Sequence, residues 1–164
     1  MKTGQAFLAG VVGGAVMTIL TAIGRLLGLD VNLEMMLGTM LLPPSAVAWI
    51  VGLAMHLLIS GLIAIAYAAG FERVTHRAGA SVGLAFSVIH IVIGGLFMGL
   101  VPALHRLIPE QMAAPGAFLS NHGAVGVISF LVLHAIYGAI VGAMYAPAVH
   151  EAPGRITTRR PRMA

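Results

Sequence analysis

The sequence predicts an all-α integral membrane protein with four transmembrane helices arranged as two repeated pairs. Hydrophobic residues make up 59% of its 164 residues and charged residues only 9%, whereas soluble domains typically carry about 25% charged residues. Four apolar segments each approach the roughly 20 residues that a spanning helix needs. These segments cover residues 6–29, 45–70, 79–103 and 123–146. The predicted transmembrane domain therefore occupies residues 1–146, and residues 147–164 form a basic tail.

The first segment follows Lys2 and shares that feature with signal peptides. It is longer than a typical apolar signal core, and it resembles the third segment, with Ile19 and Gly24 matching Ile89 and Gly94. We therefore predict a retained helix. Glycines spaced by four residues predict close helix packing; they include Gly10 and Gly14, and Gly138 and Gly142.

An internal repeat relates the second and fourth segments. Laying residues 38–68 over residues 116–146 aligns Gly38 with Gly116, His56 with His134, and Tyr67 with Tyr145. One span, the third segment, lies between the copies, so both copies cross the membrane in the same direction. We expect a 2+2 repeat of one orientation, related by a pseudo-two-fold axis along the membrane normal.

The basic residues predict the orientation. One side receives Lys2, Arg73, Arg77 and the tail residues Arg155, Arg159, Arg160 and Arg162, and the other receives only Arg25 and Arg106. Both termini are therefore expected in the cytoplasm, with the lipid bilayer as the main partner. The positive charge of the tail is better explained by its role in membrane orientation and by attraction to anionic lipid than by binding in a nucleic-acid groove. No nucleic-acid partner is therefore expected.

Several classes of chemistry are excluded or disfavoured. The chain contains no cysteine, which excludes disulfides, thiolate metal sites, iron–sulfur clusters and cysteine nucleophiles. It has no Gly-x-Ser-x-Gly motif and no phosphate-binding loop, and no apolar segment contains a pair of carboxylates. An enzyme is therefore less expected than a binding or structural protein.

Short interfacial helices are predicted in both outer connections. Residues 30–42 are apolar but interrupted by polar side chains, and Asp30 is the expected N-cap of a helix there. Residues 104–122 contain Pro109 and Pro115 and are expected to form a shorter helix followed by an irregular strap.

Three histidines are predicted to lie at one depth inside the membrane. His56, His90 and His134 are each the twelfth residue of their segments, about 17 Å along the helix from its start. A histidine is costly in lipid, so each ring needs a partner. A small residue follows each histidine four positions later and leaves space on the same helical face; these are Ser60, Gly94 and Gly138.

The spacing of these histidines leaves four interpretations open. His56 and His134 are the natural axial pair for a haem b, with His90 as the second candidate. The three rings together suit a copper, zinc or iron ion. They also suit a proton path. Alternatively, each ring only bonds between helices, a contact worth on the order of 1 kcal/mol.

A second candidate metal site lies on the predicted outer face. Thioether and imidazole groups there could bind copper(I); they are Met35, Met36, Met40, His105 and His122. The competing interpretation is that the methionines form the apolar face of an interfacial helix. Tyr67 and Tyr145 are interpreted as members of the aromatic belts at the two membrane surfaces.

The chain resembles a family of small four-helix bacterial inner-membrane proteins of unknown function. The matching features are the Ala-Gly-x-x-Gly opening, the Met-Leu-Gly-x-Met-Leu stretch at residues 36–41, and histidines on the second, third and fourth helices. By position these are Ala9, Gly10, Gly13, His56, His90, His105, His134 and Gly138. The resemblance implies four helices and the bacterial inner membrane, and it implies no particular activity.

Three functional hypotheses follow. The first is a membrane module that binds haem b or a transition metal for electron transfer or metal handling. The alternative is a structural or accessory subunit of a larger membrane complex, whose histidines only link helices. The third is a small proton- or ion-coupled transporter. Other membrane subunits or further copies of the chain are the expected protein partners.

Overall fold

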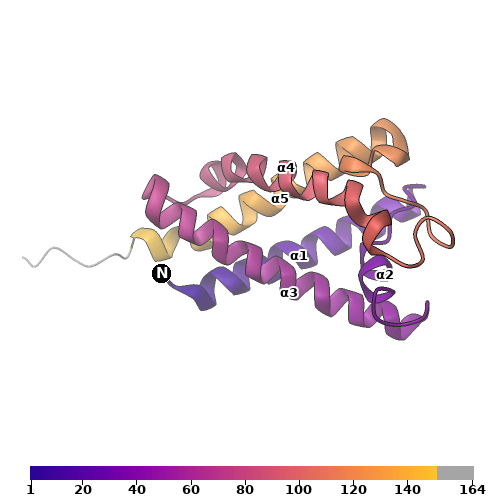
Figure 1. Cartoon of the computed structure of the whole chain (residues 1–164). Helices are drawn as coiled ribbons and strands as arrows, with labels where there is room; N and C mark the ends of the chain where they lie inside the picture. The colour runs from indigo at the N-terminus through magenta and orange to yellow at the C-terminus, as the bar shows by residue number, and fades with distance from the viewer. Residues whose placement is uncertain (151–164) are drawn as a thin grey trace, which may run out of the picture.

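The computed structural model describes residues 1–150, and the regular secondary structure in that range is all helical (Figure 1). The long helices are α1 (Thr3–Leu26), α3 (Ala46–Gly70), α4 (Ala80–Leu104) and α5 (Gly123–His150). The short elements are α2 (Leu33–Gly38), the π-helical turn η1 (Phe71–Thr75) and the 3₁₀ turn η2 (Ala117–His122). Of the basic tail predicted at residues 147–164, residues 147–150 belong to α5, and residues 151–164 lie outside the described residues.

Four helices in the described range are long and apolar enough to cross a membrane. The predicted segments coincide with these helices apart from small shifts at the ends. α1 ends at Leu26, three residues before the predicted end, because Gly28 adopts a φ of +95° that terminates the helix. α5 continues past the predicted end at Ala146 to His150.

The long helices form an open arc in the order α3, α1, α5, α4. α3 packs against α1, α1 against α5, and α5 against α4, whereas α3 and α4 pack little against each other. In Figure 1, α4 and α5 run together along one side of the molecule, and α1 and α3 along the other. The bundle is therefore closed on three sides and open on the fourth.

Glycines allow the close approach of helices within each pair, as their spacing predicted. A Cβ at Gly10 would overlap the backbone of α3 at Ser60. On the other side of the molecule, a Cβ at Gly83 of α4 would overlap the backbone of Gly138 on α5. Larger residues at these positions would force the helices apart.

Aromatic rings fill the end of the bundle where the N-terminus lies. Tyr67 and Phe71 of α3 and η1, Phe86 of α4, and Tyr137 and Tyr145 of α5 form one contiguous cluster. Tyr67 and Tyr145 are 5% and 0% exposed, so they belong to the core rather than to an exposed aromatic belt. Burial of the rings is favourable, and the Tyr67–Tyr137 pair adds to it by packing edge to face between α3 and α5.

The connection before α3 contains the predicted short helix, but it is buried. α2 packs against the start of α3, where a Cβ on Gly38 or Gly52 would overlap the backbone of Ala48 or Glu34. Its N-cap is Asn32, whose side chain accepts a hydrogen bond from the Met35 N–H at 3.0 Å. The expected cap, Asp30, lies outside the helix.

The connection after α4 differs from its prediction. Hydrogen-bonded turns occupy residues 106–112, and η2 follows at Ala117–His122, so no interfacial α-helix forms between Leu104 and Gly123. Pro109 and Pro115 lack the N–H groups that a continuous helix requires. This connection folds back onto α2, where Met36, Val101 and Ile108 form a small apolar cluster.

Candidate functional site

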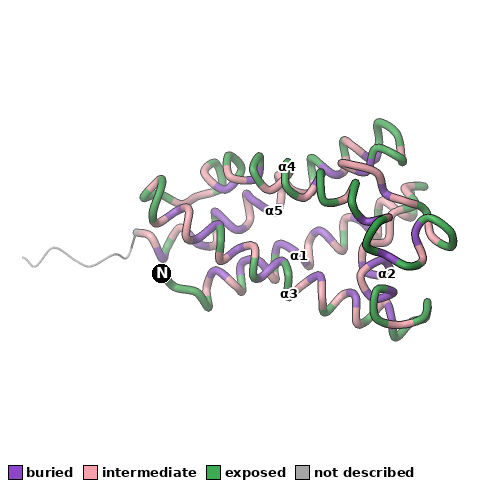
Figure 2. The backbone as a smooth tube through the Cα atoms, in the orientation of Figure 1, coloured by how far each residue is buried: buried purple, intermediate pink, exposed green. Residues whose placement is uncertain are grey.

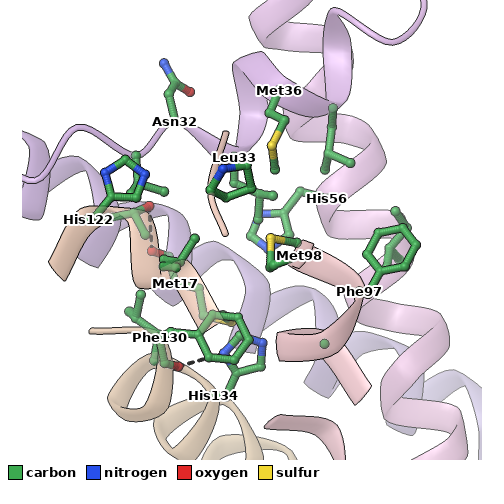
Figure 3. A pocket seen from close by; sticks show the side chains of 18 of the residues that line it. Met17, Asn32, Leu33, Met36, His56, Phe97, Met98, His122, Phe130 and His134 are labelled. Atoms are coloured by element: carbon green, nitrogen blue, oxygen red, sulfur yellow. Dashed lines mark hydrogen bonds between the residues drawn. The ribbon is translucent and has the colours of Figure 1, made fainter. Parts of the chain in front are cut away.

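A cavity of about 450 Å³ lies inside the arc, within the range of about 300–1,000 Å³ typical of small-molecule sites. All four long helices, α2 and the connection after α4 contribute to its walls. The walls are mainly apolar, and His56, His90 and His134 all line the cavity. Figure 3 shows His56 and His134 among apolar side chains that include Met36, Met98 and Phe130. The three predicted histidines thus border one space.

His134 on α5 has its ring nitrogens assigned by its surroundings. Nδ1 lies 2.8 Å from the carbonyl oxygen of Phe130, one turn earlier on the same helix. A carbonyl oxygen only accepts, so Nδ1 carries the proton and donates it. In the neutral ring, Nε2 then keeps its free lone pair. A Cβ added at Gly94 of α4 would lie 3.5 Å from this Nε2, so the nitrogen faces the part of α4 where no side chain occupies the space.

His90 on α4 lies directly beside His134. The centroids of the two rings are 4.7 Å apart and the ring planes are nearly perpendicular. Nδ1 of His90 lies 3.4 Å from the hydroxyl of Tyr67 on α3. This contact joins α3 to α4 next to the aromatic cluster.

His56 on α3 is the most buried of the three rings, at 6% exposure. Its Nδ1 lies 3.1 Å from Oγ1 of Thr18 on α1 and 3.8 Å from Oε1 of Glu34 on α2. Oε2 of Glu34 lies 3.6 Å from Nη1 of Arg25. The Glu34 side chain is fully buried, so a carboxylate stands between a basic residue of α1 and a histidine of the cavity wall.

The three rings share one arrangement. Each contacts the protein through Nδ1. Within residues 1–150, no hydrogen bond involves Nε2 of His56, His90 or His134. Two of the three Nδ1 contacts, those to Thr18 and Tyr67, cross between helices, which the simple helix-linking interpretation also expects. Nε2 of each ring is nevertheless left without a hydrogen-bond partner among the described residues.

The predicted three-histidine metal site is not preassembled. In the described part of the chain, no group of three or more His, Asp or Glu side chains lies close enough together to hold a metal ion.

The second predicted metal site, on the outer face, is only partly brought together. His105 is buried, with Nε2 donating to the Met36 carbonyl oxygen at 2.9 Å and Nδ1 accepting from the Leu107 N–H at 3.1 Å. Nε2 therefore joins the two connections, Nδ1 is used within its own connection, and neither nitrogen is left for copper. Met40 is exposed, Met35 is half-buried, and His122 lines the cavity instead.

Sequence reasoning missed several residues of this site. Thr18 and Glu34 contact His56, and Tyr137 lines the cavity and donates a hydrogen bond to the Ser60 carbonyl oxygen at 2.5 Å. Glu34 gave no signal of a contact with His56, because an acidic residue in a connection is ordinarily expected in water, although an ion pair with Arg25 was among the expectations and the structure contains it. Tyr137 had a usable signal, since it follows His134 by three residues and shares its helical face.

The comparisons with known proteins give no assignment. No family model, no curated protein and no solved structure matches this chain. The family resemblance noted from the sequence therefore stays a prediction.

Proposed function

We propose that this protein is an integral membrane module that holds a flat apolar cofactor, haem b first among the candidates, in its histidine-lined cavity. The observation that supports this most directly is the bond from His134 Nδ1 to the Phe130 carbonyl oxygen. Histidines that ligate metals almost always donate their other N–H to a carbonyl or carboxylate, which fixes the ring and leaves the second nitrogen as the ligand. His134 has this arrangement with its Nε2 beside a glycine.

His56 is the proposed second axial ligand. Its Nδ1 side faces Thr18 and the Glu34 carboxylate, which are the kinds of partner that favour coordination through Nε2. His90 is less suited to pair with His134, because their ring centroids lie only 4.7 Å apart. Two rings in direct contact leave no space for a macrocycle between them. His90 would then border the cofactor and could exchange a proton or a hydrogen bond with it.

The role proposed for a bound haem is one-electron transfer, since axial imidazoles suit that chemistry. A transition-metal ion is the second cofactor class, and it is less favoured because no group of three ligating side chains lies together within residues 1–150. The accessory-subunit alternative draws support from the interhelical contacts of His56 with Thr18 and His90 with Tyr67. Under that alternative the cavity would remain without a specific ligand.

The visible spectrum of the purified protein tests the proposal. We expect a Soret band, either as isolated or after stoichiometric haemin is added to the detergent-solubilised protein, with elemental analysis reporting iron. His134→Ala should abolish the low-spin bis-histidine spectrum. His76→Asn is the matched control, because His76 is exposed outside the cavity with φ 51°, a conformation that asparagine tolerates.

A colourless, metal-free protein that also fails to shift the haemin spectrum would overturn the haem proposal. Stoichiometric co-purification with other membrane proteins would then favour the accessory role. His134→Ala would in that case change stability only modestly.

A further inference from the structure

The cavity has a side opening between α3 and α4. These two helices pack little against each other, whereas every other neighbouring pair in the arc is packed. Ile59 of α3 and Phe97 of α4 both line the cavity, yet they are 41% and 48% exposed. These two properties together are expected of residues at the rim of an opening. Figure 2 shows exposed residues along both helices, and Figure 3 shows Phe97 at the edge of the cavity.

The opening lies at the depth of the hydrocarbon. Ile59 is about 20 Å along α3 from its start at Ala46, and α3 is about 37 Å long by its 25 residues. Since the hydrocarbon core is about 30 Å thick, a rim at this height faces acyl chains. Toward the end of the bundle where the N-terminus lies, the contacts of Tyr67 with His90 and Phe86 close the opening.

The other approach to the cavity is polar. Asp30, Asn32, Gln111 and His122 line it at the end near α2. α2 and the connection after α4 are joined over the cavity by the hydrogen bond from His105 to Met36. The walls therefore change from polar side chains near α2 to apolar side chains at the side opening.

We infer that the ligand of this cavity is a membrane-dissolved molecule and that it enters sideways from the lipid, between Ile59 and Phe97. The matching class is an amphiphile with a flat apolar body and a polar group at one end. Its body would pass between α3 and α4 to reach the histidines, and its polar end would lie near Gln111 and His122. This inference rests on the proposed binding function and adds the class of ligand and its route.

The route can be tested without knowing the ligand, because the chain has no cysteine. Met17→Cys would place one thiol on α1, inside the cavity, at a residue that is 8% exposed. The full-length variant in lipid vesicles is treated either with N-(1-pyrenyl)maleimide, which is flat and partitions into lipid, or with a charged methanethiosulfonate reagent, which stays in water. Labelling rates are then compared.

We expect the lipid-soluble reagent to label Met17→Cys severalfold faster than the charged reagent. Adding Ile59→Trp should slow the lipid-soluble reagent severalfold by filling the rim. The matched control is Leu62→Trp, one turn along α3, where the side chain is 54% exposed and does not line the cavity. That control should leave the rate unchanged. Circular dichroism and thermal unfolding of each variant confirm that the helices are retained.

Faster labelling by the charged reagent, with no effect of Ile59→Trp, would overturn the inference and assign entry to the polar end. Absence of labelling by both reagents would overturn it as well, since the cavity would then be closed. These outcomes are separate from the haem proposal, which the haemin spectrum decides: a haem-binding protein with a polar route would keep the spectrum and lose the sideways route.

Discussion

The hydroxyl of Tyr137 on α5 donates a hydrogen bond to the carbonyl oxygen of Ser60 on α3 at 2.5 Å. Both residues line the cavity, and this bond ties together two helices that otherwise contact each other little. It lies at the edge of the aromatic cluster, so it forms part of the boundary of the cavity toward the N-terminal end of the bundle. The bond therefore connects the packing of the bundle to the shape of the site.

Tyr137→Phe should lower the free energy of unfolding by about 1 kcal/mol, the usual net value of a buried hydrogen bond. Thermal unfolding in detergent measures the change. The matched comparison is Tyr67→Phe, which removes a longer contact of 3.4 Å with His90 and should cost less. A larger loss for Tyr67→Phe would contradict the importance given to the Tyr137 bond.

Gly94→Ala should preserve the fold and weaken cofactor binding. The added methyl group would meet no atom closer than 3.5 Å, and that nearest atom is Nε2 of His134. Ordinary van der Waals contact is tolerated, and alanine favours the helix, so stability should be kept or slightly raised. The methyl group would occupy the space beside Nε2, and a haemin titration should show a severalfold weaker affinity. Gly4→Ala is the control, because nothing lies within 4 Å of its added Cβ.

Nitrogen-15 NMR of histidine-labelled protein should show His134 in the neutral form protonated at Nδ1. The reason is that Nδ1 faces the Phe130 carbonyl oxygen, which cannot donate. The His134→Ala variant identifies the resonance. A ring protonated only at Nε2 would remove the lone pair on which the proposed coordination depends, and it would contradict the structure at this position.

Gly52→Ala should destabilise the protein by about 1–3 kcal/mol, the usual cost of overpacking. The added Cβ would overlap the backbone of Glu34, where α2 crosses the start of α3. Because backbone cannot move aside as a flexible side chain can, α2 should be displaced. Limited proteolysis within residues 27–45 and thermal unfolding report this. If Gly52→Ala behaves like Gly4→Ala in both measurements, the close packing of α2 on α3 is refuted.

Glu34→Ala should destabilise the protein by about 1–3 kcal/mol, since it removes the acidic partner of Arg25 and leaves space around His56. Arg25 is 24% exposed and keeps contact with water, so the loss stays below that of a fully buried pair. A double-mutant cycle with Arg25→Gln isolates the interaction. Strict additivity of the two substitutions would indicate that the 3.6 Å contact contributes nothing.

The four long helices could be predicted from the sequence, because the length and composition of an apolar segment are local properties. The sequence also allowed the prediction that His56, His90 and His134 surround one space. Each lies at the same distance from the start of its segment, which puts the three at a similar depth. The side of each ring that faces the protein could not be predicted, because Thr18, Glu34 and Tyr67 reach the rings from other helices. The burial of Tyr145 was missed for a similar reason, as position along the chain suggested a membrane surface while tertiary packing placed its ring in the core.

The aromatic cluster joins α3 directly to α4 at one end of the bundle, and this has a mechanical consequence. Tyr67, Phe86 and Tyr137 would be the pivot of any tilt between these helices, and the rim formed by Ile59 and Phe97 lies further along α3 and α4. A small tilt of α4 relative to α3 about these rings would change the distance between the two helices more at the rim than at the rings themselves. The size of a molecule that can pass would then depend on the angle between α3 and α4 as well as on the side chains at the rim.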